Sequence, residues 1–494
     1  MSPAVRRTLR TVHKYAGLTA CVWLFVLAVS GILLDHHEWR WLNQNQVPAS
    51  WTSPQIGRLV PATVMRQVKI EDGVIVGASE RGTRRSSDRG VTWQPVTFHG
   101  SSGQPQVNGL ADVGANGFAG VFLAADDGLW RLAPDGKSAM RFALSGSHMT
   151  AISVGRSDRE LVAVIDKSRL VAIDLARGSA TPIAPGSKML IPHRPVEFYR
   201  LVMDIHFGRA LLPGNWAIAL NDLGGVAMAA LSVSGLAYWW VTRRGRRRGM
   251  SMAAQRSTIR WSFRLHAPVI GLLGAIPILY LSVTALPMNH IYGFIDWSKG
   301  RTVEHSKLPP GYQSSALANE IYGVVAWPDR PGTLSIATRH GILTRSAGER
   351  VWREDLTVPT PPGVTSGNLF RVRDTVFAGF GGGNNFARTV GKASWRKLAG
   401  PSSAITGASF DGRIMYLKNS QSFFYGEIGG TELADTKIPF KNAIPGTPLF
   451  LFMADLHVGT IFHEQFKWLN DLFAVLAIVL ALSGPIIWLR RKWI

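Results

Sequence analysis

Cysteine is almost absent from this 494-residue chain, and acidic residues are scarce. Cys21 is the only cysteine, which excludes an intrachain disulfide, a cysteine-held iron–sulfur cluster and haem attachment through a Cys-x-x-Cys-His motif. Asp and Glu total 32 against 54 Lys and Arg, so the formal net charge is +22. In a soluble protein this charge would favour nucleic-acid binding. Because the densest basic runs adjoin long apolar stretches, we predict a membrane protein without a nucleic-acid partner.

Four apolar stretches are long enough to cross a lipid bilayer, because about 20 residues at 1.5 Å each cover a hydrocarbon core of roughly 30 Å. They are residues 15–34, 216–241, 266–288 and 469–489. The alternative for the first stretch is a cleaved signal peptide, since Arg6, Arg7 and Arg10 precede it. That stretch is long for a signal peptide, and no Ala-x-Ala cleavage site follows it. We therefore predict four transmembrane helices.

Basic residues cluster on one predicted side of the membrane. They precede the first stretch, follow the second and close the chain: Arg6, Arg7, Arg10, Lys14, Arg243, Arg244, Arg246, Arg247, Arg248, Arg490, Arg491 and Lys492. Short loops rich in Lys and Arg stay on the cytoplasmic side. We therefore expect cytoplasmic termini in a bacterial inner membrane, with lipid around the helices. The segments 38–195 and 291–450 are then periplasmic.

The membrane part contains an internal repeat. The sequence Asp-Ile-His-Phe-Gly at 204–208 returns as Asp-Leu-His-Val-Gly at 455–459, and Leu-Asn-Asp at 220–222 returns at 469–471. Each Asp of the second motif is followed twelve residues later by a Ser-Gly pair, and a tryptophan lies five residues beyond the serine. Agreement at so many fixed offsets predicts a duplicated two-helix unit.

The segments 38–195 and 291–450 have short alternating apolar stretches and frequent turn residues, which indicate β structure. The sequence at 86–93 fits an Asp-box, S-x-D-x-G-x-x-W, and weaker copies end at Trp352 and Trp395. We therefore predict a four-helix bundle with a large β-rich, propeller-like periplasmic domain split over two insertions. The predicted divisions are residues 1–37, 38–195, 196–290, 291–450 and 451–494.

Several histidines lie at matched positions in the two repeats. His13 and His266 stand at the cytoplasmic starts of the first and third stretches, and His37 and His290 each follow 24 residues later. Histidines at membrane depth are costly, so a matched set indicates function, whereas a single one is more simply an interfacial side chain. Neutral imidazole is a good axial ligand for haem iron.

The offset of 24 residues corresponds to roughly 36 Å of helix, so the inner and outer histidines must serve separate sites. His13 and His266 are the predicted inner pair. For the outer pair we prefer His206 and His457, because they share the Asp-x-His-x-Gly motif, whose glycine would let a flat macrocycle approach. The second choice pairs His37 with His290, and the further outer candidates are His36 and His463.

These motifs resemble those of the PepSY-associated transmembrane family. The sequence at 13–17 resembles its H-x-W-x-G helix start, with Tyr15 in place of tryptophan, and Arg264-Leu-His266 resembles its third-helix histidine. The Asp-x-His-x-Gly copies resemble its L-H-x-G element, and the Ser-Gly-x-x-x-Trp stretches resemble its helix end. The resemblance covers the four stretches and their flanks. It implies an inner-membrane reductase with two haem b groups that releases iron from a ferric siderophore.

We therefore expect a ferric siderophore or another ferric chelate as substrate, with His37 and His290 on the substrate side. No flavin or nicotinamide fingerprint appears on the cytoplasmic side. The glycine-rich run Gly379–Gly383 lies in an outer segment and does not open a helix, so it is a loop and not a dinucleotide site. The electron donor is then quinol or a cytoplasmic partner. A haem-free, membrane-anchored binding or scaffold protein is the alternative. A transporter is a third reading, but no stretch carries an acidic residue deep within it.

Overall fold

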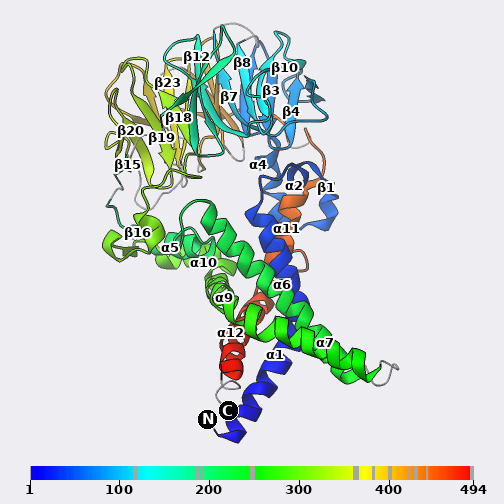
Figure 1. Cartoon of the computed structure of the whole chain (residues 1–494). Coiled ribbons are helices and arrows are strands. Elements are labelled where there is room, and N and C mark those ends of the chain that lie inside the picture. Colours follow the sequence, from blue (N-terminus) through cyan, green and yellow to red (C-terminus); the bar gives the residue numbers. More distant parts are fainter. Residues whose placement is uncertain are drawn as a thin grey trace.

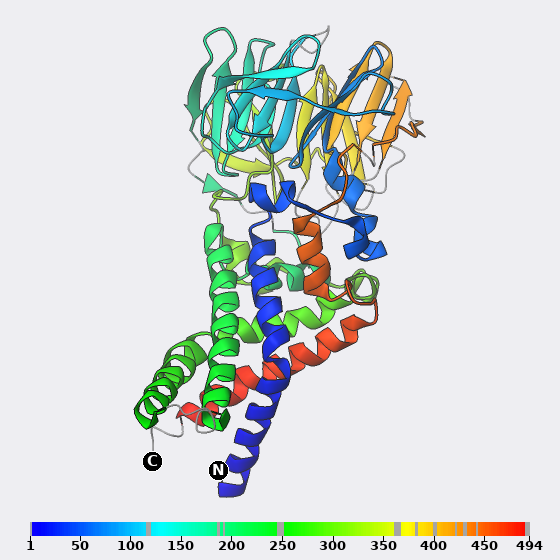
Figure 2. The ribbon, with the colours of Figure 1, turned by 90° about the vertical axis from the view of Figure 1, so that its right-hand side faces the viewer.

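The computed structural model describes residues 2–489 except 115–119, 185–187, 191–192, 245–250, 360–366, 381–383, 399–402, 420–421, 428–431 and 441–442. The chain forms a helical part and a large β-rich domain (Figure 1). The start of α1 and the end of α12 lie at the end of the helical part farthest from the β-rich domain, which we call the inner end (Figure 2). Several predicted basic residues, Arg246, Arg247, Arg248, Arg490, Arg491 and Lys492, and Gly381 to Gly383 lie outside the described residues.

Three described helices are long and apolar enough to cross a membrane. They are α1 (Pro3–Asp35), α6 (Asn215–Arg244) and α12 (Phe466–Leu489). A fourth candidate is a bent pair, α9 (Ala275–Asn289) and α10 (Ile291–Ser298), whose axes meet at 86°. Small side chains such as Ala20, Ala227 and Ala477 fill the centre of the bundle and let the helices approach closely. Larger apolar side chains, among them Val22 and Val475, point outward, as expected for contact with lipid.

The third predicted stretch, 266–288, is not one continuous helix. It follows α7 (Met252–Arg264) and consists of a π-helical segment, η3 (Leu265–Ile270), then α8 (Gly271–Leu273) and α9. Pro268 cannot donate the backbone hydrogen bond that a regular helix requires at its position. A Cβ atom on Gly271 would lie 2.4 Å from the His266 carbonyl oxygen, so only glycine fits there. Proline and glycine therefore accompany the π-helical segment that holds His266.

In the part of the β-rich domain that the structure describes, there are six sheets of four or five strands. The first three contain β2 (Gln67–Glu71), β3 (Val74–Ser79), β4 (Gly82–Ser86), β5 (Gln94–Pro95); β6 (Thr97–His99), β7 (Val107–Asp112), β8 (Val121–Ala125), β9 (Gly128–Leu132), β10 (Ser138–Ala143); and β11 (Met149–Val154), β12 (Glu160–Ile165), β13 (Arg169–Asp174), β14 (Ser179–Ile183). The other three contain β15 (Lys188–Met189), β18 (Gly323–Ala326), β19 (Leu334–Thr338), β20 (Gly341–Arg345), β21 (Val351–Glu354); β22 (Asn368–Val372), β23 (Thr375–Phe380), β24 (Asn384–Thr389), β25 (Arg396–Lys397); and β26 (Gly407–Asp411), β27 (Ile414–Lys418), β28 (Phe423–Glu427), β29 (Ala434–Asp435).

The six sheets follow one another in space and return to the first. Strands β2, β7, β11, β18, β22 and β26 each contact the next, and β26 also contacts β2. The Ile70 amide donates to Ser409 Oγ at 2.8 Å, which joins the first sheet to the last. Separate apolar clusters fill the spaces between neighbouring sheets. Because β15 pairs with β21, both sequence segments contribute to one domain.

The Asp-box forms the turn between β4 and β5. Ser86 Oγ donates to Asp88 Oδ1 at 2.7 Å and accepts from the Gly90 amide at 2.8 Å. Asp88 Oδ1 also accepts from the Thr92 amide, and the Trp93 indole donates to the Gly90 carbonyl. The motif therefore stabilises a turn through its own hydrogen bonds.

Two short ribbons connect the β-rich domain to the helices (Figures 1 and 2). In the first, β1 (Gln46–Val47) pairs with β30 (Thr447–Pro448) beside α2 (Arg40–Gln44), η1 (Ala49–Trp51), α3 (Pro54–Gly57), α4 (Val60–Val64) and α11 (Leu449–Val458). In the second, β16 (Val196–Glu197) pairs with β17 (Thr302–Val303) beside α5 (Phe198–His206), η4 (His305–Lys307) and η5 (Pro310–Gln313). In each ribbon a short helix ending near a histidine follows one strand. The repeat therefore extends beyond the membrane helices.

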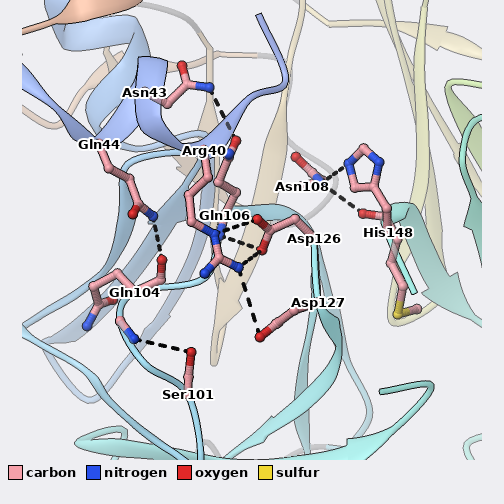
Figure 3. Close-up of polar contacts among 12 residues, drawn as sticks. Arg40, Asn43, Gln44, Ser101, Gln104, Gln106, Asn108, Asp126, Asp127 and His148 are labelled. Atoms are coloured by element: carbon pink, nitrogen blue, oxygen red, sulfur yellow. Dashed lines mark hydrogen bonds and ion pairs between the residues drawn. The ribbon is translucent and has the colours of Figure 1, made fainter. Parts of the chain in front are cut away.

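Polar contacts fasten α2 to the domain, as Figure 3 shows. Arg40 donates two hydrogen bonds to Asp126, at 2.8 and 2.7 Å. Asn43 and Gln44 donate to Gln106 and to the Gln104 carbonyl. A bidentate ion pair with flanking amides fixes orientation better than a single contact. The domain is thus held against the outer end of the helices.

Candidate functional site

The inner pair, His13 on α1 and His266 on η3, lies between the helices near their inner end. The imidazole centroids are 6.4 Å apart, and the two rings are perpendicular. Each ring has a serine beside it on a different helix: His13 Nδ1 lies 2.7 Å from Ser483 Oγ, and His266 Nδ1 lies 2.9 Å from Ser234 Oγ. Both serines are buried. The structure thus brings together two histidines that are far apart in the sequence.

The separation of the two rings suits two ligands on opposite sides of one metal. An imidazole nitrogen binds a first-row metal at about 2 Å, and the ring centre lies about 1 Å beyond it, which places opposed centroids about 6 Å apart. The observed distance is 6.4 Å. Among the described residues no group of three or more His, Cys, Asp or Glu is placed to hold a bare metal ion. A haem needs only two protein ligands, because the macrocycle supplies the others.

A cavity of about 820 Å³ surrounds the inner pair. Its walls are mostly apolar, with Leu24, Met228 and Ile278 among them. Gly235 and Gly484 lie beside the histidines, since a Cβ atom on them would stand 3.3 Å from His266 Cε1 and 3.4 Å from His13 Cε1. Cofactor sites commonly have this size and apolar character. Arg10, Lys14 and Arg243 also line the cavity and are exposed, so they could receive acidic groups of a ligand.

The outer pair, His206 and His457, ends the short helices α5 and α11. The two side chains are half-buried and close enough to interact electrostatically. His206 Nδ1 lies 2.9 Å from Thr284 Oγ1 on α9, and His457 Nδ1 lies 2.9 Å from Ser30 Oγ on α1. Gly31 faces His457 as Gly235 faces His266, with 3.3 Å from a built Cβ to the ring. The arrangement of the inner site is therefore repeated here.

The hydroxyl partners also determine the proton position on the outer histidines. Ser30 Oγ donates to the Val26 carbonyl at 2.7 Å, and Thr284 Oγ1 donates to the Tyr280 carbonyl at 2.6 Å. A hydroxyl has one proton, so with these bonds to the carbonyls the two oxygens accept from Nδ1. In that tautomer Nε2 of each outer histidine carries the lone pair. A neutral imidazole in this tautomer can bind a metal through Nε2. At the inner site the serines make longer contacts to their own helices, at 3.3 and 3.5 Å.

The other residues of the Asp-x-His-x-Gly motif position the histidine. Asp204 and Asp455 are fully buried. Asp455 accepts from the Ser53 amide at 2.6 Å and from Ser53 Oγ at 2.8 Å, and Asp204 accepts from Tyr312 and Arg200. These contacts tie α5 and α11 to the outer segments. The aspartates are thus anchors and leave the imidazoles free.

The glycines of that motif are required by the backbone conformation at the helix ends. Gly208 and Gly459 have φ of 70° and 81° and end their helices in the left-handed conformation. A Cβ atom on Gly208 would lie 2.7 Å from the Ala217 carbonyl oxygen, and one on Gly459 would lie 2.3 Å from the Phe466 ring. The glycines therefore permit a tight turn into α6 and α12. The glycines beside histidine rings are instead Gly31, Gly235 and Gly484.

Two further histidines pair with the second repeated motif. His36 Nε2 lies 3.0 Å from Asp222, and His290 Nε2 lies 2.7 Å from Asp471. Burial lowers the pKa of His36, but its hydrogen bond to Asp222 and its contact with Glu38 outweigh burial, so the pKa is raised. His36, and not His37, therefore occupies the position equivalent to His290.

The π-helical segment explains this difference of one residue. Ser30 follows His13 by 17 residues, whereas its counterpart Thr284 follows His266 by 18. A π-bulge absorbs one inserted residue without ending the helix. The equal spacing of 24 residues in the sequence therefore matches His290 with His37, whereas the structure matches it with His36. His37 itself is 49% exposed and lies near Phe450, and His463 caps a turn by accepting from the Gln465 amide.

Sequence reasoning missed the four hydroxyl partners. Ser234 and Ser483 belong to the repeated Ser-Gly pairs, so a signal for them existed. Ser30 also precedes a glycine and Thr284 precedes an alanine. The shared feature is a small hydroxyl residue followed by a small residue on the helix that faces each histidine. Only the packing shows which histidine each one serves.

Comparison with protein families gives a match over nearly the whole chain. The sequence pattern described as the PepSY-associated TM region matches residues 10–491. The chain belongs to the PepSY-associated TM family. Since this match includes both insertions, the β-rich domain is part of a PepSY-associated TM protein. Comparison with curated proteins gives no match.

Solved structures show only distant likeness to this PepSY-associated TM protein. They include the extracellular domain of a one-component system of B. thetaiotaomicron (10% identity, 76% of this chain and 33% of that chain, TM-score 0.35). An ancestral GH74 enzyme (10%, 80% and 40%, 0.33) and a nidogen/laminin complex (8%, 76% and 93%, 0.34) are also similar. The chain thus spans about a third of the length of the first of these.

Proposed function

We propose that the protein is a membrane-bound oxidoreductase that holds two haem b groups and reduces a ferric chelate, such as a ferric siderophore, on its outer side. The observation that carries the proposal is the inner pair of perpendicular imidazoles, 6.4 Å apart in a cavity of about 820 Å³. The hydroxyl contacts of the outer pair support a second site. When bound, the two haems would supply one-electron carriers near opposite membrane surfaces.

The protein's own residues would then have separate tasks. His13 with His266, and His206 with His457, would each hold one haem iron through two imidazoles, which favours electron transfer over oxygen chemistry. The buried hydroxyls hold the ring orientation, and the apolar walls of the inner cavity exclude water. Quinol or a cytoplasmic protein is the proposed electron donor. His290 would lie on the substrate side together with His37.

We further propose a bacterial inner-membrane location with cytoplasmic termini and a periplasmic β-rich domain. Arg6, Arg7 and Arg10 at the inner end of α1 support this orientation. The bent pair α9 and α10 would supply the fourth membrane span. The six consecutive sheets support a six-bladed, propeller-like domain, since their first strands make contacts that return to β2.

A reduced-minus-oxidised optical spectrum and a pyridine haemochrome assay on the purified chain test the haem proposal. We expect two haem b per chain. Replacing His13 or His266 with alanine should leave only the outer haem, and replacing His206 or His457 should leave only the inner one. Chains without haem after expression with excess haem would favour the alternative, a membrane-anchored binding protein. Loss of the outer haem in His37→Ala or His290→Ala, with retention in His206→Ala and His457→Ala, would reassign the outer pair.

A further inference from the structure

One arginine of the β-rich domain binds the loop that follows the outer histidine helix α5. Arg339 lies in the hairpin between β19 and β20, which are placed above α5 in Figure 1, and it is only 3% exposed. Its Nη1 donates to the Arg209 carbonyl at 2.8 Å, and its Nη2 donates to the Gly311 carbonyl. Arg209 follows His206 by three residues. A buried guanidinium therefore connects the domain directly to the chain that leaves His206.

The two segments that Arg339 binds are packed against each other. The Gly311 amide donates to the Ala210 carbonyl at 2.8 Å, and a Cβ atom on Gly311 would lie 2.6 Å from that carbonyl oxygen. The planar guanidinium then binds one carbonyl from each segment, which a lysine ammonium on its flexible stem cannot do with the same geometry. Glu320 lies 3.3 Å from Arg339 Nε and holds the guanidinium in place.

The same cluster also reaches the chain that precedes His206. The Arg339 guanidinium lies 5.5 Å from the centre of the Tyr312 ring. The Tyr312 hydroxyl donates to Asp204, which lies two residues before His206 and also pairs with Arg200 at 3.0 Å. Both Tyr312 and Asp204 are buried. The chain is thus held on each side of the proposed outer ligand.

The contact on the His457 side is less direct. Arg81, in the hairpin between β3 and β4, donates to the carbonyls of Pro445 and Gly446 at 3.1 and 3.2 Å. These residues precede His457 by 12 and 11 positions. The β-rich domain therefore contacts the immediate neighbours of only one of the two outer histidines through its hairpin arginines.

We propose that Arg339 is a positioning residue of the outer site. It acts through the Arg209 carbonyl, and through Tyr312 and Asp204, to fix the orientation of the His206 imidazole. The β-rich domain then forms part of the outer site, and a movement of this domain changes the ligand geometry at the outer haem. This inference rests on the proposed two-haem reductase and specifies how its outer site is controlled.

Electron paramagnetic resonance of the oxidised, haem-loaded full chain tests the proposal. The g values of a low-spin haem depend on the relative orientation of its two axial imidazoles. We expect two low-spin signals, of which the outer one is identified by its absence in His206→Ala. Arg339→Met should shift the outer signal and leave the inner signal unchanged, and the outer haem should dissociate about tenfold faster.

Two further variants separate hydrogen bonding from charge and from loss of folding. Tyr312→Phe removes only the hydroxyl that donates to Asp204, so it should keep the fold and still shift the outer signal. Arg339→Lys keeps the positive charge without the planar fork, so it should not restore the wild-type signal.

Arg371→Met is the matched control. Arg371 is also a buried arginine of the β-rich domain, but its Nη2 donates at 2.9 Å to the Gly155 carbonyl of the same domain. Its replacement should leave both signals unchanged. An unchanged outer signal in both Arg339→Met and Tyr312→Phe, an equal shift in Arg371→Met, or full recovery in Arg339→Lys would overturn the inference while the reductase proposal stands. A wild-type chain that takes up no haem would overturn both.

Discussion

The hydrogen bond between Ser483 and His13 allows the proposed inner haem site to be tested without removing a ligand. In Ser483→Ala, His13 Nδ1 loses a partner at 2.7 Å in a buried position. An unsatisfied buried polar atom costs about 1–3 kcal/mol. Removing the hydrogen-bond partner of a metal-binding histidine typically lowers metal affinity about 10- to 100-fold, which corresponds to the same range of free energy. We therefore expect inner haem to dissociate about 10 to 100 times faster, with both haems still present at equilibrium.

Transfer of haem to excess apomyoglobin, followed optically, measures the two dissociation phases. Ser483→Ala and Ser234→Ala should accelerate one phase, and Ser30→Ala and Thr284→Ala should accelerate the other. Ser232→Ala is the matched control, because this buried serine lines the same cavity and has no histidine contact among the described residues. If Ser232→Ala and Ser483→Ala accelerate haem loss equally, the effect belongs to the cavity wall and our reasoning about ligand orientation fails.

Three further predictions concern topology and stability. Protease added from the periplasmic side of spheroplasts should cleave within 38–195 and spare 243–260; cleavage of the latter alone would reverse the orientation. Asp455→Asn should loosen α11 and the outer haem by about 2 kcal/mol while sparing the inner haem, since Ser53 donates to both carboxylate oxygens and an amide has only one acceptor oxygen; haem retention assays would detect it. Burial lowers the pKa of Lys418 to about 7. Burying its charged form therefore lowers the free energy of unfolding at pH 7 and below, and this cost decreases as the pH rises toward the ordinary value of 10.5. Lys418→Met should therefore raise the thermal stability of the β-rich domain most at pH 7 and hardly at pH 10, as circular dichroism can measure; a gain that does not depend on pH would contradict the cause.

The amino-acid sequence predicts most of the helical architecture. Apolar length places α1, α6 and α12 correctly, because a membrane span needs many consecutive apolar residues and the signal is strong. The repeated Asp-x-His-x-Gly motif similarly identifies α5 and α11 as equivalent helices. Apolar content predicts the span 266–288 but does not reveal the π-helical segment η3 at its start. This segment shifts the register by one residue, so the position equivalent to His290 is His36 and not His37.

The sequence alone could not predict contacts between residues that lie far apart in the chain. Strand β15 pairs with β21, although the helices α5 to α10 lie between them in the sequence. The local alternation of apolar and polar residues cannot specify so distant a partner. Likewise, the Ser483 that orients His13 is 470 residues away. The sequence also does not distinguish the possible roles of the glycine in the Asp-x-His-x-Gly motif, because a tight turn and a ligand contact both require a residue without a side chain.

The four pairs between a histidine and a hydroxyl explain why the duplicated unit must act as a whole. His13 and His206 belong to the first half of the membrane part, and their partners Ser483 and Thr284 belong to the second. The relation is reversed for His266 and His457, whose partners are Ser234 and Ser30. Every histidine is therefore oriented by the opposite half, and neither half contains a complete site. Because α1 carries His13 near one end and Ser30 near the other, a shift of this helix would disturb both sites together. The two proposed haems are thus structurally coupled through α1, even though about 26 Å of helix separates these two positions.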